Sequence, residues 1–140
     1  MVFFGGLVFF YYLLWLVSFF AFTHVLSEPD MRGTIATTIM FFIAGLAHFI
    51  APKKLVAMMP AKLPCKPFLN YFTGACEMLF AVGILLPRTY VVSGWGLIVL
   101  LVLMFPANVY IAVKNSSLYN ISRLFFQPVY IAWVWWFCLN

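Results

Sequence analysis

Long apolar runs separated by short polar intervals make up most of the chain. Five such runs span residues 2–26, 34–51, 68–87, 91–113 and 124–139. A helix rises about 1.5 Å per residue, so about 20 apolar residues cross a hydrocarbon core about 30 Å thick. The pattern therefore predicts an all-α fold, a polytopic transmembrane helix bundle with five spans in a single domain, residues 1–140.

The polar intervals predict where these helices begin and end. Pro29 is expected to end the first helix, and Asp30 is a candidate cap for the second. Prolines interrupt residues 52–67, so no continuous helix is expected there, and the lysines among apolar residues predict a short segment at the membrane interface. Pro106 predicts a kink in the fourth run, and the fifth run is short for a span.

Composition supports a membrane protein. Of the 140 residues, 66% are hydrophobic and 8% are charged, whereas about a quarter of the residues in a soluble domain are charged. The formal net charge of +5 is the excess expected from topology and from contact with anionic lipid head groups. No basic run is long enough to predict a nucleic-acid partner.

Lysine and arginine predict the orientation. With five crossings, residues 52–67 and 114–123 lie on one face of the membrane. That face holds six basic residues against two on the other: Lys53, Lys54, Lys62, Lys66, Lys114 and Arg123, against Arg32 and Arg88. The positive-inside rule therefore predicts a cytoplasmic N-terminus, with both basic intervals in the cytoplasm.

Glu77 lies inside the third apolar run. Because a charge in the bilayer costs several kcal/mol, an intramembrane ionisable residue is a functional hypothesis by default. Small and polar residues recur with it at helical spacing, so one face of this helix should point at other helices. These residues are Asn70, Thr73, Gly74, Glu77 and Ala81.

Further polar side chains lie toward the basic face of the bundle. They are His48, Asn108, Arg123 and Gln127, and the second run carries a matching line in Thr34, Thr38, Phe41, Gly45 and His48. Together the stripes predict a polar pocket in the cytoplasmic half, closed by the proline-rich interval with Met59, Pro60 and Pro64. Two explanations stay open: a ligand or proton site, or hydrogen bonds that only hold the helices together.

Several other chemistries lack the residues they need. Cys65, Cys76 and Cys138 form no CxxC pair, so a dithiol mechanism has no support. His24 and His48 lie toward opposite faces and cannot both bind one metal. There is no phosphate-binding glycine loop and no nucleophile elbow. We identify no catalytic residue, no metal site and no intrinsic cofactor.

Four blocks of the sequence resemble, in order, successive blocks of DoxX-like integral membrane proteins: AGLAHFIAPKKLVAMMPAKLP, YFTGACEMLFAVGILLPRT, WGLIVLLVLMFPANVYIA and RLFFQPVYIAW. The resemblance covers roughly residues 32–134 and implies a four-helix core, formed by the second to fifth runs, in a bacterial cytoplasmic (inner) membrane. The motif positions are His48, Pro60, Gly74, Glu77, Pro87, Pro106, Asn108, Arg123 and Gln127. The first run is an addition to this core. Family members would place the proline-rich interval outside, and we keep the orientation that the basic residues predict.

Two functions are compatible with these features. The first is a non-catalytic accessory subunit or assembly factor that packs against other integral membrane proteins, which the aromatic content of 21% fits. The second is a quinone-linked redox or small-ligand role, in which the pocket around His48 and Glu77 binds a quinone or lipid and Glu77 exchanges a proton. The lack of a redox centre in the sequence favours the first.

Overall fold

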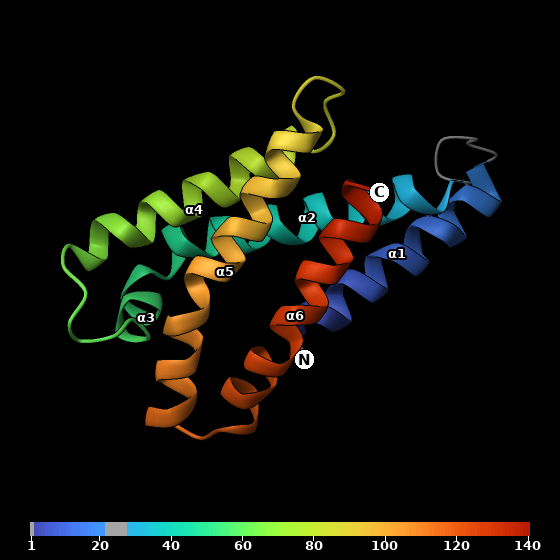
Figure 1. Cartoon of the computed structure of the whole chain (residues 1–140). Coiled ribbons are helices and arrows are strands. Elements are labelled where there is room, and N and C mark those ends of the chain that lie inside the picture. The colour runs from blue at the N-terminus through green and yellow to red at the C-terminus, as the bar shows by residue number, and fades with distance from the viewer. Residues whose placement is uncertain (1, 22–27) are drawn as a thin grey trace.

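The computed structural model of the chain describes residues 2–21 and 28–140, and the side chains of residues 5–19 and 28–140. This part of the chain contains helices and no strand, which confirms the all-α prediction there. The helices are α1 Val2–Ala21, α2 Pro29–Ile50, α3 Pro52–Ala57, α4 Lys66–Gly83, α5 Tyr90–Lys114 and α6 Leu118–Cys138 (Figure 1). Two of them, α2 and α5, are long and apolar enough to cross a membrane, judged by length and composition alone.

The second helix begins earlier than residue 34. Pro29 occupies the start of α2 and Glu28 is its N-cap, so the prediction that Asp30 caps this helix was wrong. Proline suits the first helical position because the N–H that it lacks has no intrahelical partner there. Asp30 lies instead in the first turn, where a negative charge is favoured by the helix dipole. The predicted end of the first helix, residues 22–26, and His24 lie outside the described residues.

The bounds of α4 and α6 also differ from the sequence prediction. Helix α4 ends at Gly83, and the Thr89 hydroxyl donates a hydrogen bond of 2.8 Å to the Gly83 carbonyl. Helix α6 begins at Leu118 because Ser117 caps it, with its hydroxyl accepting a hydrogen bond from the Asn120 N–H. At 21 residues, α6 is longer than the apolar run 124–139, because it includes the polar residues that precede that run.

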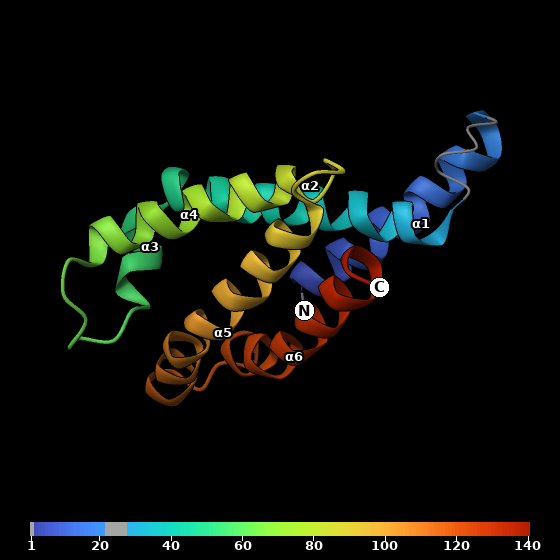
Figure 2. The same ribbon diagram turned by 45° about the horizontal axis from the view of Figure 1, so that its top comes forward.

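The helices form two pairs that diverge from one another. Helix α4 runs alongside α2, and helix α6 runs alongside α5. Helix α1 lies against α2 at the end of the bundle away from α3 (Figures 1 and 2). Glycines allow α2 and α4 to approach closely: a Cβ built on Gly45 would lie 2.6 Å from the Gly74 carbonyl oxygen. Backbone contact of this kind is typical of helices that pack in membranes.

Apolar side chains lie on the outside of the bundle as well as in its core. Leu7, Ala36, Phe41, Leu97 and Val134 are among the buried residues that form the core. Large apolar side chains on the outer faces are more than half exposed, among them Phe9, Leu79, Leu103 and Phe125. Exposed large apolar side chains therefore occur on helices along the whole bundle, from α1 to α6.

Candidate functional site

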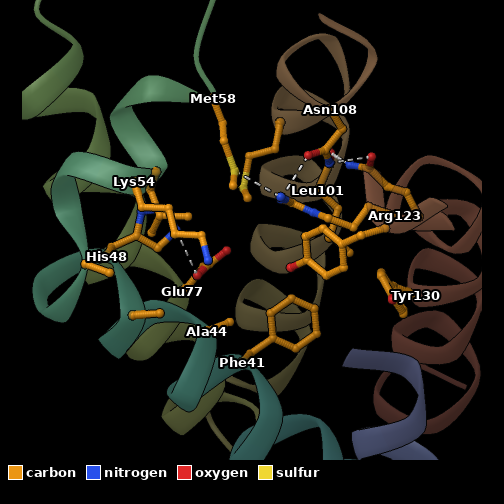
Figure 3. A pocket seen from close by; sticks show the side chains of 16 residues that line it. Phe41, Ala44, His48, Lys54, Met58, Glu77, Leu101, Asn108, Arg123 and Tyr130 are labelled. Atoms are coloured by element: carbon orange, nitrogen blue, oxygen red, sulfur yellow. Dashed lines mark hydrogen bonds and ion pairs between the residues drawn. The ribbon is translucent and has the colours of Figure 1, made fainter. Parts of the chain in front are cut away.

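A cavity of about 340 Å³ lies at the end of the bundle where α3 approaches the beginning of α6. Figure 3 shows His48 and Glu77 on one wall and Asn108 and Arg123 on the facing wall. Its polar lining comes from five helices: His48 of α2, Lys54 of α3, Glu77 of α4, Asn108 of α5, and Tyr119, Arg123, Gln127 and Tyr130 of α6. Apolar lining is contributed by Phe41, Leu101 and Met104 among others.

Asn70 fixes the orientation and tautomer of His48. The Asn70 Nδ2 group donates a hydrogen bond of 2.8 Å to the His48 carbonyl oxygen, and Asn70 Oδ1 lies 2.9 Å from His48 Nδ1. A carbonyl oxygen can only accept, so the amide must present its nitrogen to the backbone and its oxygen to the imidazole. Nδ1 of His48 is therefore the donor, and in a neutral imidazole Nε2 is a bare acceptor.

That acceptor faces Glu77. His48 Nε2 lies 3.6 Å from Glu77 Oε2, and the Glu77 side chain is almost fully buried, at 4% exposure. Glu77 Oε2 has no hydrogen-bond partner among the residues that the structure describes. A carboxylate beside a neutral imidazole would bring two acceptors face to face, so a proton on either residue stabilises the pair. Whichever residue carries that proton, the pair has no net charge.

A chain of hydrogen bonds forms the facing wall. The Arg123 Nη2 group donates to Asn108 Oδ1 at 3.0 Å, and Asn108 Nδ2 donates to Gln127 Oε1 at 2.9 Å. Gln127 Nε2 in turn donates to the Leu101 carbonyl of α5. These bonds join α5 to α6, so the interhelical role that the sequence left open for Asn108 and Gln127 is part of this structure.

Arg123 also connects α6 to the end of α3. Its Nη1 group donates to the Met58 sulfur at 3.3 Å, and its guanidinium carbon lies 5.8 Å from the centre of the Tyr119 ring. Each of these contacts is to a neutral group. The guanidinium is thus held in place at the cavity by neutral groups, and it forms no direct ion pair with a described residue.

The structure brings most of the predicted site residues together. His48, Glu77, Asn108, Arg123 and Gln127 all line the cavity, and Asn70 supports it by holding His48. Thr73 does not line it, and its hydroxyl donates to the Leu69 carbonyl of its own helix at 2.7 Å. The loop residues Met59, Pro60 and Pro64 follow α3 and are also absent from the lining.

The sequence analysis expected residues 52–67 to close the pocket, but it named Met59, Pro60 and Pro64 in place of the residues that line it. Lys54, Leu55 and Met58 of this segment line the cavity. Met58 follows Leu55 by three residues and Lys54 by four, and this spacing after a proline that starts a helix could have indicated a common face. The sequence analysis also began the last helix too late, at residue 124, and so left Tyr119 and Arg123 out of it.

Comparison with known protein families assigns this region. Residues 37–138 match the family described as Domain of unknown function (DUF8561), which is more than half of the chain. The chain belongs to the DUF8561 family. The DUF8561 region contains all of the residues that line the cavity and excludes α1. No curated protein and no solved structure matches the chain.

Proposed function

We propose that the chain is an integral membrane protein in which α1, α2, α4, α5 and α6 each cross the bilayer. The length and hydropathy of α2 and α5 support this, as do the apolar side chains exposed on the outer faces of α4 and α6. Helix α3, with Lys53 and Lys54, lies at the interface. The excess of basic residues at this end favours the cytoplasm, with the N-terminus on the same side, in a bacterial inner membrane.

A DoxX-like relationship is part of this proposal. The motif positions that the resemblance implies include His48, Glu77, Asn108, Arg123 and Gln127, and these residues surround one cavity. Their grouping in helices α2, α4, α5 and α6 is the arrangement expected of a four-helix core to which α1 has been added.

The function supported best by the geometry is the binding of a small amphipathic ligand in the cavity. The observation that carries it is Glu77 Oε2, a buried polar atom that borders the cavity and has no hydrogen-bond partner in the described part of the chain. Leaving such a group unsatisfied costs about 1–3 kcal/mol. A ligand that supplies the missing hydrogen bond recovers this free energy.

The two walls and the apolar lining fit such a molecule. A polar head group placed between Glu77 and Arg123 would bind to both walls, while its tail would contact Phe41, Leu101 and Met104. The volume of about 340 Å³ falls in the range of small-molecule sites. A quinone has suitable carbonyl acceptors, and the proton held by His48 and Glu77 could pass to it or from it.

An accessory or assembly role is the second candidate, favoured by one face of α1. Phe9, Tyr12, Trp15 and Phe19 recur at helical spacing, and each is at least half exposed. Aromatic side chains are common where membrane helices meet partners or the membrane interface. A stoichiometric membrane partner that co-purifies in mild detergent, and is lost when these residues become leucine, would support this role.

Mass spectrometry of co-purified small molecules tests the ligand proposal. The Ala44→Phe variant places a ring in the cavity lining, while Ala132→Phe adds the same ring on the exposed surface of α6. Wild type and Ala132→Phe should retain the same molecule in a stoichiometric amount, and Ala44→Phe should lose it. If all three proteins carry the same mixture of lipids in the same amounts, the cavity is not a ligand site.

A further inference from the structure

The cavity brings two positive side chains together, and neither forms an ion pair with a described residue. These are Arg123 and the exposed Lys54, which both line it. A guanidinium has five N–H groups, of which the described residues accept two, through Asn108 and Met58. The remaining N–H groups of Arg123 are available to another acceptor.

The sequence leaves no other acid that could balance these charges. The whole chain has three acidic residues, Glu28, Asp30 and Glu77. Glu28 and Asp30 lie at the beginning of α2, whereas His48 is near its end. His48 follows Asp30 by 18 positions, a rise of about 27 Å along the helix. A charge at that distance is screened at physiological ionic strength. Glu77 is therefore the single acid at this end of the bundle.

Glu77 is already balanced by its neighbour. Asn70 leaves His48 Nε2 as an acceptor toward Glu77, which favours a proton on one of the two residues, and the pair that holds this proton has no net charge. This pair contributes nothing to offset Arg123 or Lys54. The cavity as a whole therefore carries two positive charges, in a site where low dielectric strengthens the attraction for an anion.

We propose that the cavity of this chain binds an amphipathic anion, a molecule with one acidic head group and a hydrocarbon tail. This inference rests on the proposed function. The head group is a carboxylate or a phosphate. Arg123 presents its free N–H groups to the anionic oxygens, and Lys54 approaches from α3 at the cavity mouth. The proton held by Glu77 and His48 supplies a further donor, and the apolar lining takes the beginning of the tail.

Two sources offer this chemistry, a free fatty acid and an acidic phospholipid of the bilayer. Surface lysines such as Lys62 attract acidic phospholipids in a diffuse way. The cavity differs because Arg123 is fixed by Asn108 and Met58 and is half-buried. Binding to the cavity should therefore depend on Lys54 and Arg123 more than on other basic residues.

Binding of two probes with the same chain length tests the charge of the head group. The protein is placed in nanodiscs of neutral phosphatidylcholine, and dissociation constants are measured for oleic acid, at a pH where it is ionised, and for oleyl alcohol. Oleate should bind at least about tenfold more tightly than the alcohol, since a charge-assisted hydrogen bond contributes about 1.5–3 kcal/mol, or roughly ten- to a hundredfold. Nanodiscs that contain phosphatidylglycerol distinguish the two sources. If phosphatidylglycerol weakens oleate binding, the natural ligand is a bilayer lipid; if oleate binding is unchanged, it is a free fatty acid.

Four variants assign the effect to the cavity. Arg123→Gln should weaken oleate binding about tenfold or more, and Lys54→Gln should weaken it several-fold, while both variants weaken oleyl alcohol binding by a smaller factor. Lys54 is exposed, so its replacement does not disturb folding. Arg88→Gln and Lys62→Gln remove the same charges outside the cavity lining and should change neither constant.

The outcomes separate this inference from the proposed function. If oleyl alcohol binds as tightly as oleate and Ala44→Phe abolishes both, the cavity is a ligand site and the anionic head group is wrong. If Ala44→Phe changes neither constant, the proposed function fails, and the inference fails with it.

Discussion

Asn70 holds His48 through both ends of its amide, with one hydrogen bond to the His48 carbonyl and one to its imidazole. The two residues are 22 positions apart in the chain and belong to α2 and α4. This contact therefore fixes the packing of two helices and, at the same time, the nitrogen that His48 presents to Glu77. The protonation of the cavity wall depends on a residue that does not line the cavity.

Replacing Asn70 should destabilise the bundle. In Asn70→Leu the His48 carbonyl and Nδ1 both lose a buried partner, so the free energy of unfolding should fall by about 1–3 kcal/mol. Titration with a denaturing detergent measures it. Thr73→Val, one turn away, removes a hydroxyl that bonds only within its own helix and should change stability by less than about 0.5 kcal/mol. Equal losses in the two variants would contradict the role of Asn70.

A methyl group at Gly74 should separate α2 from α4. A Cβ built there would lie 2.8 Å from the Gly45 carbonyl oxygen, whereas a Cβ on Gly5 would meet nothing within 4 Å. We expect Gly74→Ala to cost about 1–3 kcal/mol in the unfolding titration. Gly5→Ala should be neutral or slightly stabilising, because alanine has the higher helix propensity. A Gly74→Ala protein as stable as wild type would show that the helices do not meet here.

Asn108 and Gln127 should act as one unit in stability. A double-mutant cycle of Asn108→Ala and Gln127→Ala should give a coupling free energy of about 0.5–1.5 kcal/mol, the range of interhelical hydrogen bonds in membranes. Ser93, about four turns from Asn108 on α5, provides the control, and Ser93→Ala should be additive with Asn108→Ala. Additivity of the first pair as well would mean that the bond between α5 and α6 contributes nothing.

Native cysteines allow the orientation to be tested. Cys65 is exposed just before α4, Cys76 is half-buried and Cys138 is buried. A membrane-impermeant maleimide should label Cys65 in inverted membrane vesicles and not in right-side-out vesicles, because we place this connection in the cytoplasm. The Cys65→Ser variant supplies the background. Labelling of Cys65 only in right-side-out vesicles would reverse the proposed topology.

Periodicity predicted the parts of the site that lie on regular helices. Asn70, Gly74, Glu77 and Ala81 follow helical spacing, and all four are buried. The same reasoning placed His48 on the matching face of α2. Such spacing is visible in the sequence because a helix with one packed face repeats its small and polar residues about every 3.6 positions.

The parts that were missed depend on caps and on tertiary contacts. The start of α6 is set by the Ser117 hydroxyl, a local bond that lies outside any apolar run. The contribution of Met58 depends on where α3 lies relative to Arg123, 65 positions further along the chain. Hydropathy indicates neither the cap nor the Met58 contact. The cap is a short-range polar bond, and the contact of Met58 with Arg123 arises from the packing of distant segments.

Photo-crosslinking tests the central claim, that the cavity holds an amphipathic ligand, most directly. A fatty acid with a diazirine in its chain is added to the protein in nanodiscs and irradiated, and the modified residues are identified by mass spectrometry. We predict cross-links to Phe41 and Met104 in the cavity, lost in Ala44→Phe and in the presence of excess unlabelled fatty acid. Cross-links confined to outward-facing residues such as Leu79 and Val102, unchanged by either treatment, would contradict the claim.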